Sequence, residues 1–441
     1  MTNEERKIQY MNRNIKLSPS LIALTWDVIF VWTISTMYFT QVKGLSNAET
    51  VMLDSILMFS GCLMCVPVTR LFQNIKPITA TRIGTAGYGI YLLLCIFGNS
   101  YPLFMLAQFF LAFGYAVNSV KTNSVLTDSL SVVKRDNDYQ RIYGKGISLL
   151  YIIEFIGAIG ITYVFDWKPE AAYWLSFAVV VITIILTFFF KDPEKFQDKN
   201  VDIVSRVVDS SKVELKDKKP ESFKKILASG FFICLLVYAF FMRGVLSVTS
   251  SGLKLYLNEL IYNYNIIPIW AYGYIYGISR LTSAFASKYQ FKFNLKWGVR
   301  TLIIINTLLV LGFLIVGLLQ LLMPTSIVGI VVIILMNCVL CALRMPNQIF
   351  VNNYLQVCTS KRNIERAYSI RVMVEYLGYA VISFVYSILL TVYNDNLGLT
   401  NLTYIGIFAV PLIVSLVLFI RVLCKKYAQK YTIIKPEYTE D

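Results

Sequence analysis

Ionisable side chains inside long apolar stretches are the residues of this chain most able to do chemistry. Asp27 lies within the first apolar stretch, and Glu154 and Glu375 lie within two later ones. An aspartate at the centre of a membrane-spanning helix costs about 2.5–3.5 kcal/mol. A carboxylate in that position is therefore expected to bind a proton or to face a cationic group. The alternative is a static salt bridge to a neighbouring helix.

Three arginines also fall within apolar stretches, and each shares a helical face with other polar residues. The three stripes are Arg243, Ser247 and Ser250; Tyr272, Tyr276, Arg280 and Ser283; and Asn337, Arg344, Gln348 and Asn352. Pro346 removes a backbone hydrogen bond and is expected to kink its helix. A polar stripe on a lipid-embedded helix is expected to line water or a solute, and the alternative is contact between helices. Because a guanidinium binds carboxylate or phosphate through two hydrogen bonds, these arginines favour an anionic or hydrogen-bond-rich ligand.

These patterns define two sets of candidate site residues. The solute-binding candidates are Trp26, Arg243, Tyr276, Arg280, Asn337, Arg344 and Gln348. The coupling and gating candidates are Asp27, Glu154, Arg371 and Glu375. Arg371 lies one helical turn before Glu375, so the alternative for these two is a local structural ion pair. Trp26 and Trp32, inside the first apolar stretch, are candidates for stacking on a solute.

The sequence gives little support for nucleotide binding, metal binding or redox chemistry. The chain has no histidine, and it has no GxxxxGK[ST] loop that would hold a nucleotide phosphate. Cys62/Cys65 and Cys338/Cys341 have CxxC spacing but fall within apolar stretches. Small apolar contacts between helices explain them better than metal or redox chemistry. The sequence therefore predicts no metal site, no cofactor and no enzymatic activity.

Membrane-spanning helices are the elements that must hold these side chains. The chain is 56% hydrophobic and 15% charged, with a mean hydropathy of +0.61, whereas soluble domains are roughly 25% charged. A span needs about 20 mostly apolar residues. Twelve stretches meet this requirement: 20–41, 52–69, 83–99, 102–122, 147–165, 171–190, 226–251, 267–286, 301–321, 325–353, 369–392 and 401–422.

The positions of lysine and arginine set the expected orientation of these spans. Most of the 41 lysines and arginines lie in alternate connecting segments, which the positive-inside rule places in the cytoplasm. The segments on the other side hold only Lys43, Lys168 and Lys254. Both termini are therefore predicted to be cytoplasmic. The net charge of +15 lies in short loops rather than on one face, which argues against nucleic-acid binding.

One long polar segment separates the spans into two groups of six. We predict an N-terminal bundle over 1–190, a cytoplasmic linker over 191–225 with a short surface helix near 201–215, and a C-terminal bundle over 226–441. The two halves repeat weakly, because Arg141-Ile142-Tyr143-Gly144 precedes the fifth span and Arg366-Ala367-Tyr368-Ser369 precedes the eleventh. Such repeats are expected for parallel halves related by an axis along the membrane normal. The predicted fold is an all-α membrane protein built from two pseudo-symmetric six-helix bundles.

With these features the chain resembles the major facilitator superfamily over nearly its whole length. The two segments before the fifth and eleventh spans resemble the arginine-bearing loops of that family. The family's loop between helices two and three usually reads G-x-L-x-D-R-x-G-R, and here Arg70 fits the pattern. The glycine is absent and Thr69 takes the aspartate position, so the motif assigns no subfamily and the resemblance rests on topology.

The resemblance implies a secondary transporter that moves a small organic solute by alternating access through a central polar cavity. A proton gradient is one candidate energy source, and the default is a monomer in a cell membrane, with lipid as its surroundings. The composition suggests a bacterial plasma membrane. The alternatives are a multidrug exporter of the same fold, a flippase for lipid-linked oligosaccharides, and a membrane sensor that moves no solute.

Overall fold

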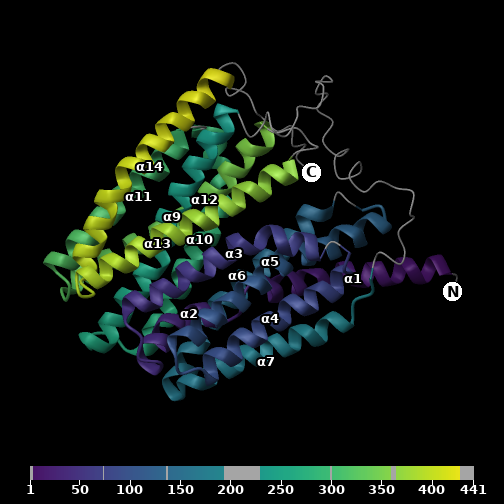
Figure 1. Ribbon diagram of the computed structural model, residues 1–441, viewed down its shortest axis with the longest axis horizontal. Coiled ribbons are helices and arrows are strands. Elements are labelled where there is room, and N and C mark those ends of the chain that lie inside the picture. The colour runs from purple at the N-terminus through teal and green to yellow at the C-terminus, as the bar shows by residue number, and fades with distance from the viewer. Residues whose placement is uncertain are drawn as a thin grey trace. The chain divides into compact units, whose positions relative to one another are not determined.

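The structure of the protein is a computed structural model that describes residues 3–72, 74–135, 138–192, 229–297, 300–358 and 364–427. Within these residues every regular element is a helix (Figure 1). The expected all-α architecture is therefore confirmed. Nearly all of the predicted linker over 191–225, including its surface helix near 201–215, lies outside the described residues.

Eleven stretches among the described residues are helical, long and apolar enough to cross a membrane. They are Glu5–Val42, Asn47–Cys65, Pro77–Phe97, Tyr101–Val132, Ile142–Trp167, Pro169–Phe188, Gly230–Asn263, Arg300–Leu322, Ile327–Arg344, Ile370–Val392 and Leu397–Val422. Helix α10 (Ile269–Trp297) occupies the place of the predicted eighth span but is not one of the eleven. Tyrosines, serines and Arg280 interrupt its apolar residues and lower its hydropathy.

Contacts within the chain define two compact units. Unit 1 comprises Met1–Leu45, Ile56–Asp217 and Pro268–Gly277. Unit 2 comprises Ser46–Ser55, Lys218–Ile267 and Ile278–Asp441. Two helices are divided between the units: α3 (Asn47–Leu71) begins in unit 2, and α10 begins in unit 1. The boundaries predicted for the bundles and the linker stay a prediction.

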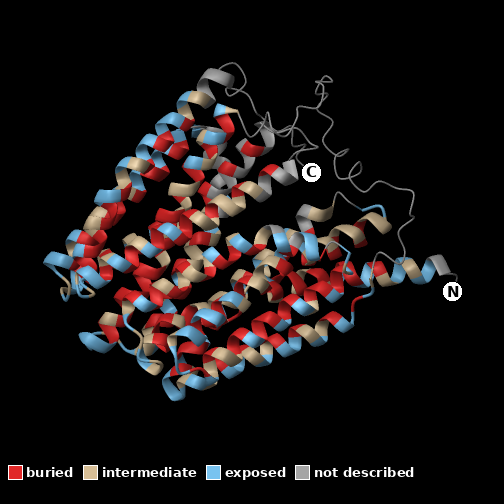
Figure 2. Ribbon diagram, viewed as in Figure 1, coloured by how far each residue is buried: buried red, intermediate tan, exposed pale blue. Residues whose placement is uncertain are grey.

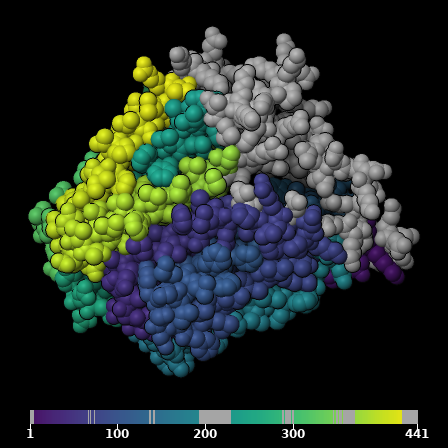
Figure 3. Space-filling view, viewed as in Figure 1, coloured from purple at the N-terminus to yellow at the C-terminus, as the bar shows by residue number. Residues whose placement is uncertain are grey.

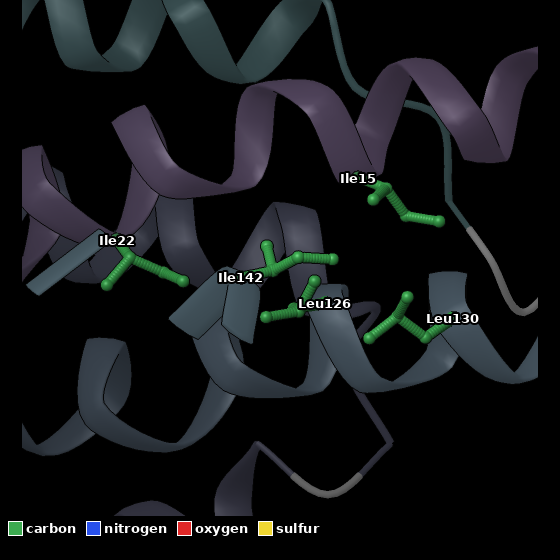
Figure 4. Packing of buried hydrophobic residues seen from close by; sticks show 5 residues of the cluster. All are labelled: Ile15, Ile22, Leu126, Leu130 and Ile142. Atoms are coloured by element: carbon green, nitrogen blue, oxygen red, sulfur yellow. The ribbon is translucent and has the colours of Figure 1, made fainter. Parts of the chain in front are cut away.

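Unit 1 packs its helices around a core of branched aliphatic side chains. Besides its parts of α3 and α10, its elements are α1 (Asn3–Trp26), α2 (Val31–Met37), the π-helical turn η1 (Tyr38–Val42), α4 (Pro77–Phe97), α5 (Tyr101–Val132), α6 (Tyr139–Trp167) and α7 (Pro169–Phe188). Figure 4 shows one cluster in which Ile15 and Ile22 of α1 meet Leu126 and Leu130 of α5 and Ile142 of α6. This contact fixes the position of α1, which carries the first candidate residues at its end.

Asn14 ties the beginning of α1 to the segment that follows α7. Its fully buried amide donates to the carbonyl of Lys191 at 2.7 Å and accepts from the Lys191 backbone N–H at 3.1 Å. It also donates to the Ser129 hydroxyl of α5 at 3.2 Å. A buried amide without such partners would cost about 1–3 kcal/mol. The first helix and the end of the sixth span are therefore held together by a two-way hydrogen bond.

Unit 2 contains the beginning of α3, α9 (Gly230–Asn258), the π-helical turn η5 (Glu259–Asn263), most of α10, α11 (Arg300–Leu322), α12 (Ile327–Cys358), α13 (Ile364–Val392) and α14 (Leu397–Tyr427). In Figure 3, α14 in yellow and α13 in yellow-green lie on the visible surface of this unit. The outward side of α14 is coloured as exposed in Figure 2, and it carries Ile407, Val410, Val414 and Val417. A row of exposed aliphatic side chains at helical spacing is the surface that lipid requires.

Candidate functional site

The first span is broken next to its aspartate. Helix α1 ends at Trp26, and α2 begins only at Val31. Between them Phe30 has a φ of 76°, a conformation that bulky residues rarely adopt. Strained backbone of this kind tends to occur at functional sites and needs surrounding contacts to hold it. The predicted continuous helix over 20–41 is therefore interrupted at Asp27.

The Asp27 carboxylate accepts hydrogen bonds from three different groups. Its Oδ1 atom accepts from the backbone N–H of Val28 at 2.7 Å. The same oxygen accepts from the indole N–H of Trp32 and from the hydroxyl of Tyr115 in α5. The indole N–H of Trp32 also lies 2.7 Å from the Tyr115 oxygen. Donors from three groups hold the carboxylate in one orientation at the break.

Glu154 of α6 is the second acidic group near Asp27. It lies within electrostatic range of Asp27, and it is partly buried. Two like charges in a medium of low dielectric repel each other. Unit 1 therefore brings two of the coupling candidates within electrostatic range of each other.

A glycine in α6 makes room for the break in the first span. A Cβ atom added to Gly157 would lie 2.6 Å from the ring of Phe30. The ring therefore packs directly on the backbone of α6, where a larger residue would push it away. This contact is one reason that Phe30 can hold its positive φ, and it fixes the segment that carries Asp27.

The aromatic candidates of unit 1 lie in different surroundings. Trp26 is 45% exposed and makes an edge-on contact with the ring of Tyr143 at 6.4 Å between centroids. Trp32 donates to Asp27, as described above. Tyr276 is buried, and its ring stacks on Tyr272 one turn earlier in α10. The part of α10 that holds Tyr272 and Tyr276 belongs to unit 1, whereas Arg280 belongs to unit 2.

In unit 2 the polar stripe of α9 is longer than predicted. The expected residues Arg243, Ser247 and Ser250 are continued by Ser251, Lys254 and Asn258, again at spacings of three and four. The helix extends beyond the predicted end of its span at 251, so Lys254 lies within α9 rather than in a loop. Lys254 is 4% exposed, and its position outside the membrane stays a prediction. Ser247, Ser250 and Ser251 all lie within the regular helix α9.

Asp54 is a functional candidate that the sequence analysis missed. It lies in the first turns of α3, and it accepts a hydrogen bond from the Ser251 hydroxyl at 3.1 Å. Lys254 lies within electrostatic range of the same carboxylate. Its position within a predicted apolar span could have identified Asp54 as a candidate. Its hydrogen-bond partner Ser251 could not have been predicted, because it lies 197 residues away in the sequence.

The predicted ion pair between Arg371 and Glu375 is present in α13. The Arg371 Nη1 and Glu375 Oε1 atoms are 3.4 Å apart, and the arginine is fully buried. Arg243 and Arg344 also lie within electrostatic range of Glu375. The guanidinium of Arg243 stands over the ring of Tyr379, 5.8 Å from its centroid. Three helices of unit 2 therefore carry basic groups within electrostatic range of one carboxylate.

Close packing between α9 and α13 brings these groups together. A Cβ atom on Gly378 would lie 2.3 Å from the carbonyl of Phe240, and one on Gly244 would lie 2.7 Å from the carbonyl of Gly378. The hydroxyls of Ser247 and Ser383 are 3.1 Å apart across the same contact. Small residues at the contact allow two membrane helices to approach this closely. Arg243 and Glu375 lie next to this contact in their own helices.

The polar stripe of α12 is described in its first part only. Asn337 is buried and donates to the carbonyl of Ile333 in its own helix at 2.9 Å. Arg344 lies one turn after Cys341 and is partly buried. Gln348 and Asn352 lie in α12, but the structure does not describe their side chains. The α12 stripe is therefore placed only from Asn337 to Arg344.

Both units hold ionisable groups inside their spans. Among the residues described, the spans of unit 1 carry Asp27 and Glu154 together with Arg82 and Lys121. The spans of unit 2 carry Arg243, Lys254, Arg344 and Arg371 together with Asp54, Glu259 and Glu375. Such groups are costly in lipid and normally mark an ion or solute path. No set of three or more ligating side chains that could hold a metal ion occurs among the described residues.

Solved structures of transporters share this fold. The nucleoside transporter NupG aligns with a TM-score of 0.69 at 15% identity, over 94% of this chain and 99% of its own. A POT family transporter in complex with a thioalcohol-conjugated peptide aligns with a TM-score of 0.66 at 11% identity, over 96% of both chains. A bacterial homologue of the human lysosomal transporter Spinster aligns with a TM-score of 0.61 at 14% identity, over 98% of this chain and 99% of its own. Identities this low show a common fold only.

The sequence itself matches one family. No curated protein matches the chain at a significant level. The profile of the Major Facilitator Superfamily matches residues 17–383, which is most of the chain. The match includes the broken first span, the polar stripe of α9 and the ion pair of α13. This chain is a multi-pass membrane protein that belongs to the Major Facilitator Superfamily.

Proposed function

We propose that the protein is a secondary transporter that moves a small organic solute across a cell membrane by alternating access. In this proposal twelve spans form two groups of six, α10 is the eighth span, and both termini are cytoplasmic. A polar cavity takes up the solute. The family and the shared fold with known transporters support the class of function.

The observation that carries the proposal is the set of ionisable side chains inside the spans of both units. Each charged group at this depth lowers the stability of the protein unless a partner or water solvates it. A bundle with a purely structural role would be at least as stable with apolar residues at these positions. A path for a polar solute would explain why apolar helices contain Asp27, Glu154, Arg243 and Arg344.

Asp27 is the best-placed residue for coupling transport to a proton gradient. It lies at a break in its helix, where backbone groups lack their usual helical partners. Its carboxylate accepts from Val28, Trp32 and Tyr115, and Glu154 lies within electrostatic range of it. A carboxylate among several hydrogen-bond donors, at a break between two helices, is placed to exchange a proton when those helices move.

The first experiment identifies the solute. Purified protein in detergent is heated with nucleosides, peptides, amino acids, sugars, organic anions and lipophilic cations, and its unfolding temperature is recorded. A ligand at 100 times its dissociation constant stabilises the folded state by about 2.7 kcal/mol. The solute that stabilises the protein is then used, radiolabelled, in proteoliposomes with an imposed pH gradient.

The second experiment tests the proton-coupling role. Wild-type protein is expected to accumulate the solute against its gradient when a pH gradient is present. Asp27→Asn is expected to lose this accumulation and to keep exchange of labelled for unlabelled solute. Asp166→Asn, at an exposed position near the end of α6, serves as the control and is expected to behave like wild type. Normal proton-driven accumulation by Asp27→Asn would exclude this role for Asp27.

A further inference from the structure

The end of α7 is anchored by side chains from two other helices of unit 1. Helix α7 packs against α1 and α4 (Figure 1). Phe190, two residues after the helix ends, is buried in one cluster with Leu21 of α1 and Ile78 of α4. The segment from Phe188 to Lys191 therefore has a fixed place on unit 1.

Arg82 of α4 caps the last turn of α7. Its Nε donates to the Thr187 hydroxyl at 2.9 Å, and its Nη2 donates to the Thr187 carbonyl at 3.2 Å. The guanidinium also stacks on Phe188, with 4.1 Å between Cζ and the ring centroid. A guanidinium has five N–H groups, and these hydrogen bonds use two of them. The cap therefore leaves Arg82 with donors for an oxyanion.

Arg13 and Lys191 bring two further cations to the same end of α7. Arg13 donates to the carbonyl of Phe189, and Lys191 follows two residues later. The Arg13 guanidinium and the Lys191 ammonium both lie over the ring of Tyr10, at 5.7 and 5.8 Å from its centroid. Both cationic side chains are exposed. Two like charges on one ring repel each other, and an anion that contacts both relieves the repulsion.

The charge of this surface stays positive when its acids are counted. Asp192 follows Lys191 in the chain and is partly buried. Up to residue 16, helix α1 carries four basic side chains, Arg6, Lys7, Arg13 and Lys16, against two acidic ones, Glu4 and Glu5. With Arg82 and Lys191 added, the basic groups outnumber the acidic groups.

These cations lie at the edge of a membrane span. The span Pro169–Phe188 ends at Phe188, which is 63% exposed, and Phe189 after it is 55% exposed. Ile182 and Ile185, one and two turns earlier, are exposed as well. Exposed apolar side chains on a spanning helix face lipid, and basic side chains at its end lie at the level of the head groups.

Capping alone does not account for all three cations. Basic side chains near the end of a helix commonly bond its last carbonyls, which explains Arg13 and Arg82. Lys191 has a different position, because its hydrogen bonds with Asn14 use its backbone. Its exposed ammonium adds charge to the surface rather than support to the helix.

We propose that the end of α7, with Arg13, Arg82 and Lys191, binds the head group of an anionic phospholipid. The phosphate contacts the cations, and the acyl chains lie along α7 beside Phe188 and Phe189. A zwitterionic head group carries a cation of its own, which these residues repel, so the site selects a net negative charge. The proposal goes beyond the transport function and holds for either orientation of the protein in the membrane.

Native mass spectrometry measures the binding of single lipids to the full-length protein in detergent. Phosphatidylglycerol and phosphatidylcholine with identical acyl chains are titrated, and the first binding constants are compared. Wild-type protein is expected to bind phosphatidylglycerol roughly tenfold more tightly or better, since several basic side chains contribute. Equal binding of the two lipids would overturn the proposal.

Lys191→Gln is the most specific variant, because the hydrogen bonds between the Lys191 backbone and Asn14 do not need the lysine side chain. The variant is expected to bind phosphatidylglycerol about fivefold more weakly, since one basic side chain contributes about 1 kcal/mol at an anionic surface. Binding of phosphatidylcholine should not change. Lys191→Arg keeps the charge and is expected to bind like wild type. Unchanged binding of phosphatidylglycerol by Lys191→Gln would contradict the site.

Arg421→Gln is the matched control, because it removes one positive charge from an exposed position in α14 of unit 2. This variant is expected to keep the wild-type affinity for phosphatidylglycerol. A loss as large as that of Lys191→Gln would show that binding follows the total charge of the protein, which would overturn the assignment to α7.

Thermal unfolding separates a lipid head group from a free oxyanion. The unfolding temperature is recorded with phosphatidylglycerol, with phosphatidylcholine and with inorganic phosphate, at an ionic strength matched with chloride. Phosphatidylglycerol alone is expected to raise it, and the rise should be smaller in Lys191→Gln. An equal rise with inorganic phosphate would assign the site to a free oxyanion and overturn the lipid proposal. Neither measurement involves the solute, so failure here is distinguishable from failure of the transport function.

Discussion

The hydroxyl of Tyr115 donates a hydrogen bond to the carboxylate of Asp27, which lies 88 residues earlier in the chain. The bond joins α5 to the break in the first span. A hydrogen bond to a charged group contributes about 1.5–3 kcal/mol, so this contact is one of the main restraints on the break. It also gives the carboxylate a donor that does not depend on the local backbone.

Tyr115→Phe is expected to lower the free energy of unfolding by about 1.5–3 kcal/mol, because it removes this donor and keeps the ring. A double-mutant cycle with Asp27→Asn measures the coupling in detergent by chemical unfolding. We expect the double variant to be more stable than the sum of the two single losses predicts. Strictly additive losses would show that the two side chains do not interact.

Gly157→Ala is expected to destabilise the protein by about 1–3 kcal/mol, because the new methyl group meets the ring of Phe30 at 2.6 Å. Gly160→Ala is the matched control, since nothing lies within 4 Å of a Cβ atom there. Alanine in a helix is favoured over glycine by roughly 1 kcal/mol, so Gly160→Ala should be neutral or stabilising. Thermal unfolding of the two variants gives the comparison, and equal unfolding temperatures would contradict the packing role of Gly157.

Glu375→Gln is expected to cost about 3–5 kcal/mol, because it leaves the fully buried Arg371 without its carboxylate partner. Replacing both residues, as Arg371→Met with Glu375→Leu, should recover most of this loss. The measurement is chemical unfolding of the two variants beside wild type. A double variant less stable than Glu375→Gln would show that Arg371 has a stabilising role independent of Glu375.

Asp395 is expected to make stability depend on pH. It lies in the loop between α13 and α14, and burial raises the pKa of its carboxyl, although a hydrogen bond from the Asn47 backbone N–H opposes this shift. The folded protein therefore holds the proton more tightly than the unfolded chain does. As pH rises above the unfolded value of about 3.9, the ionised carboxyl increasingly favours unfolding, and this penalty persists at neutral pH.

Asp395→Asn removes that penalty, and asparagine tolerates the φ of 61° at this position. The variant is expected to unfold at a higher temperature than wild type at pH 7.5 and at the same temperature near pH 4. A lower unfolding temperature for the variant at pH 7.5 would contradict the effect of burial.

Local features of this structure were predictable from sequence, and features that depend on distant partners were not. Arg371 and Glu375 are four residues apart on one helix, so their pairing follows from helical geometry alone. Apolar stretches likewise predicted the helices, because length and hydropathy are properties of a single segment. The membership of the chain in its superfamily was also apparent from the succession of such segments.

The residues around the break in the first span contain no sequence feature that would predict it. Asp27-Val28-Ile29-Phe30 contains neither glycine nor proline, and the break depends on Tyr115 and Gly157 in other helices. The end of α9 was predicted too early for a related reason. The charge of Lys254 suggested a loop, but the residue is buried within the helix, with Asp54 in electrostatic range of it. Tertiary contacts in both cases override what the local sequence favours.

The reciprocal hydrogen bond between Asn14 and Lys191 joins the first span to the segment that follows the sixth. The two ends of this six-span part of the chain hold each other in place. The peptide bond that joins it to the rest of the chain therefore adds little to its stability. A gene split after residue 192 should therefore yield two polypeptides that assemble when they are produced together. Copurification of the two fragments would show that the covalent link after residue 192 is not needed for their assembly.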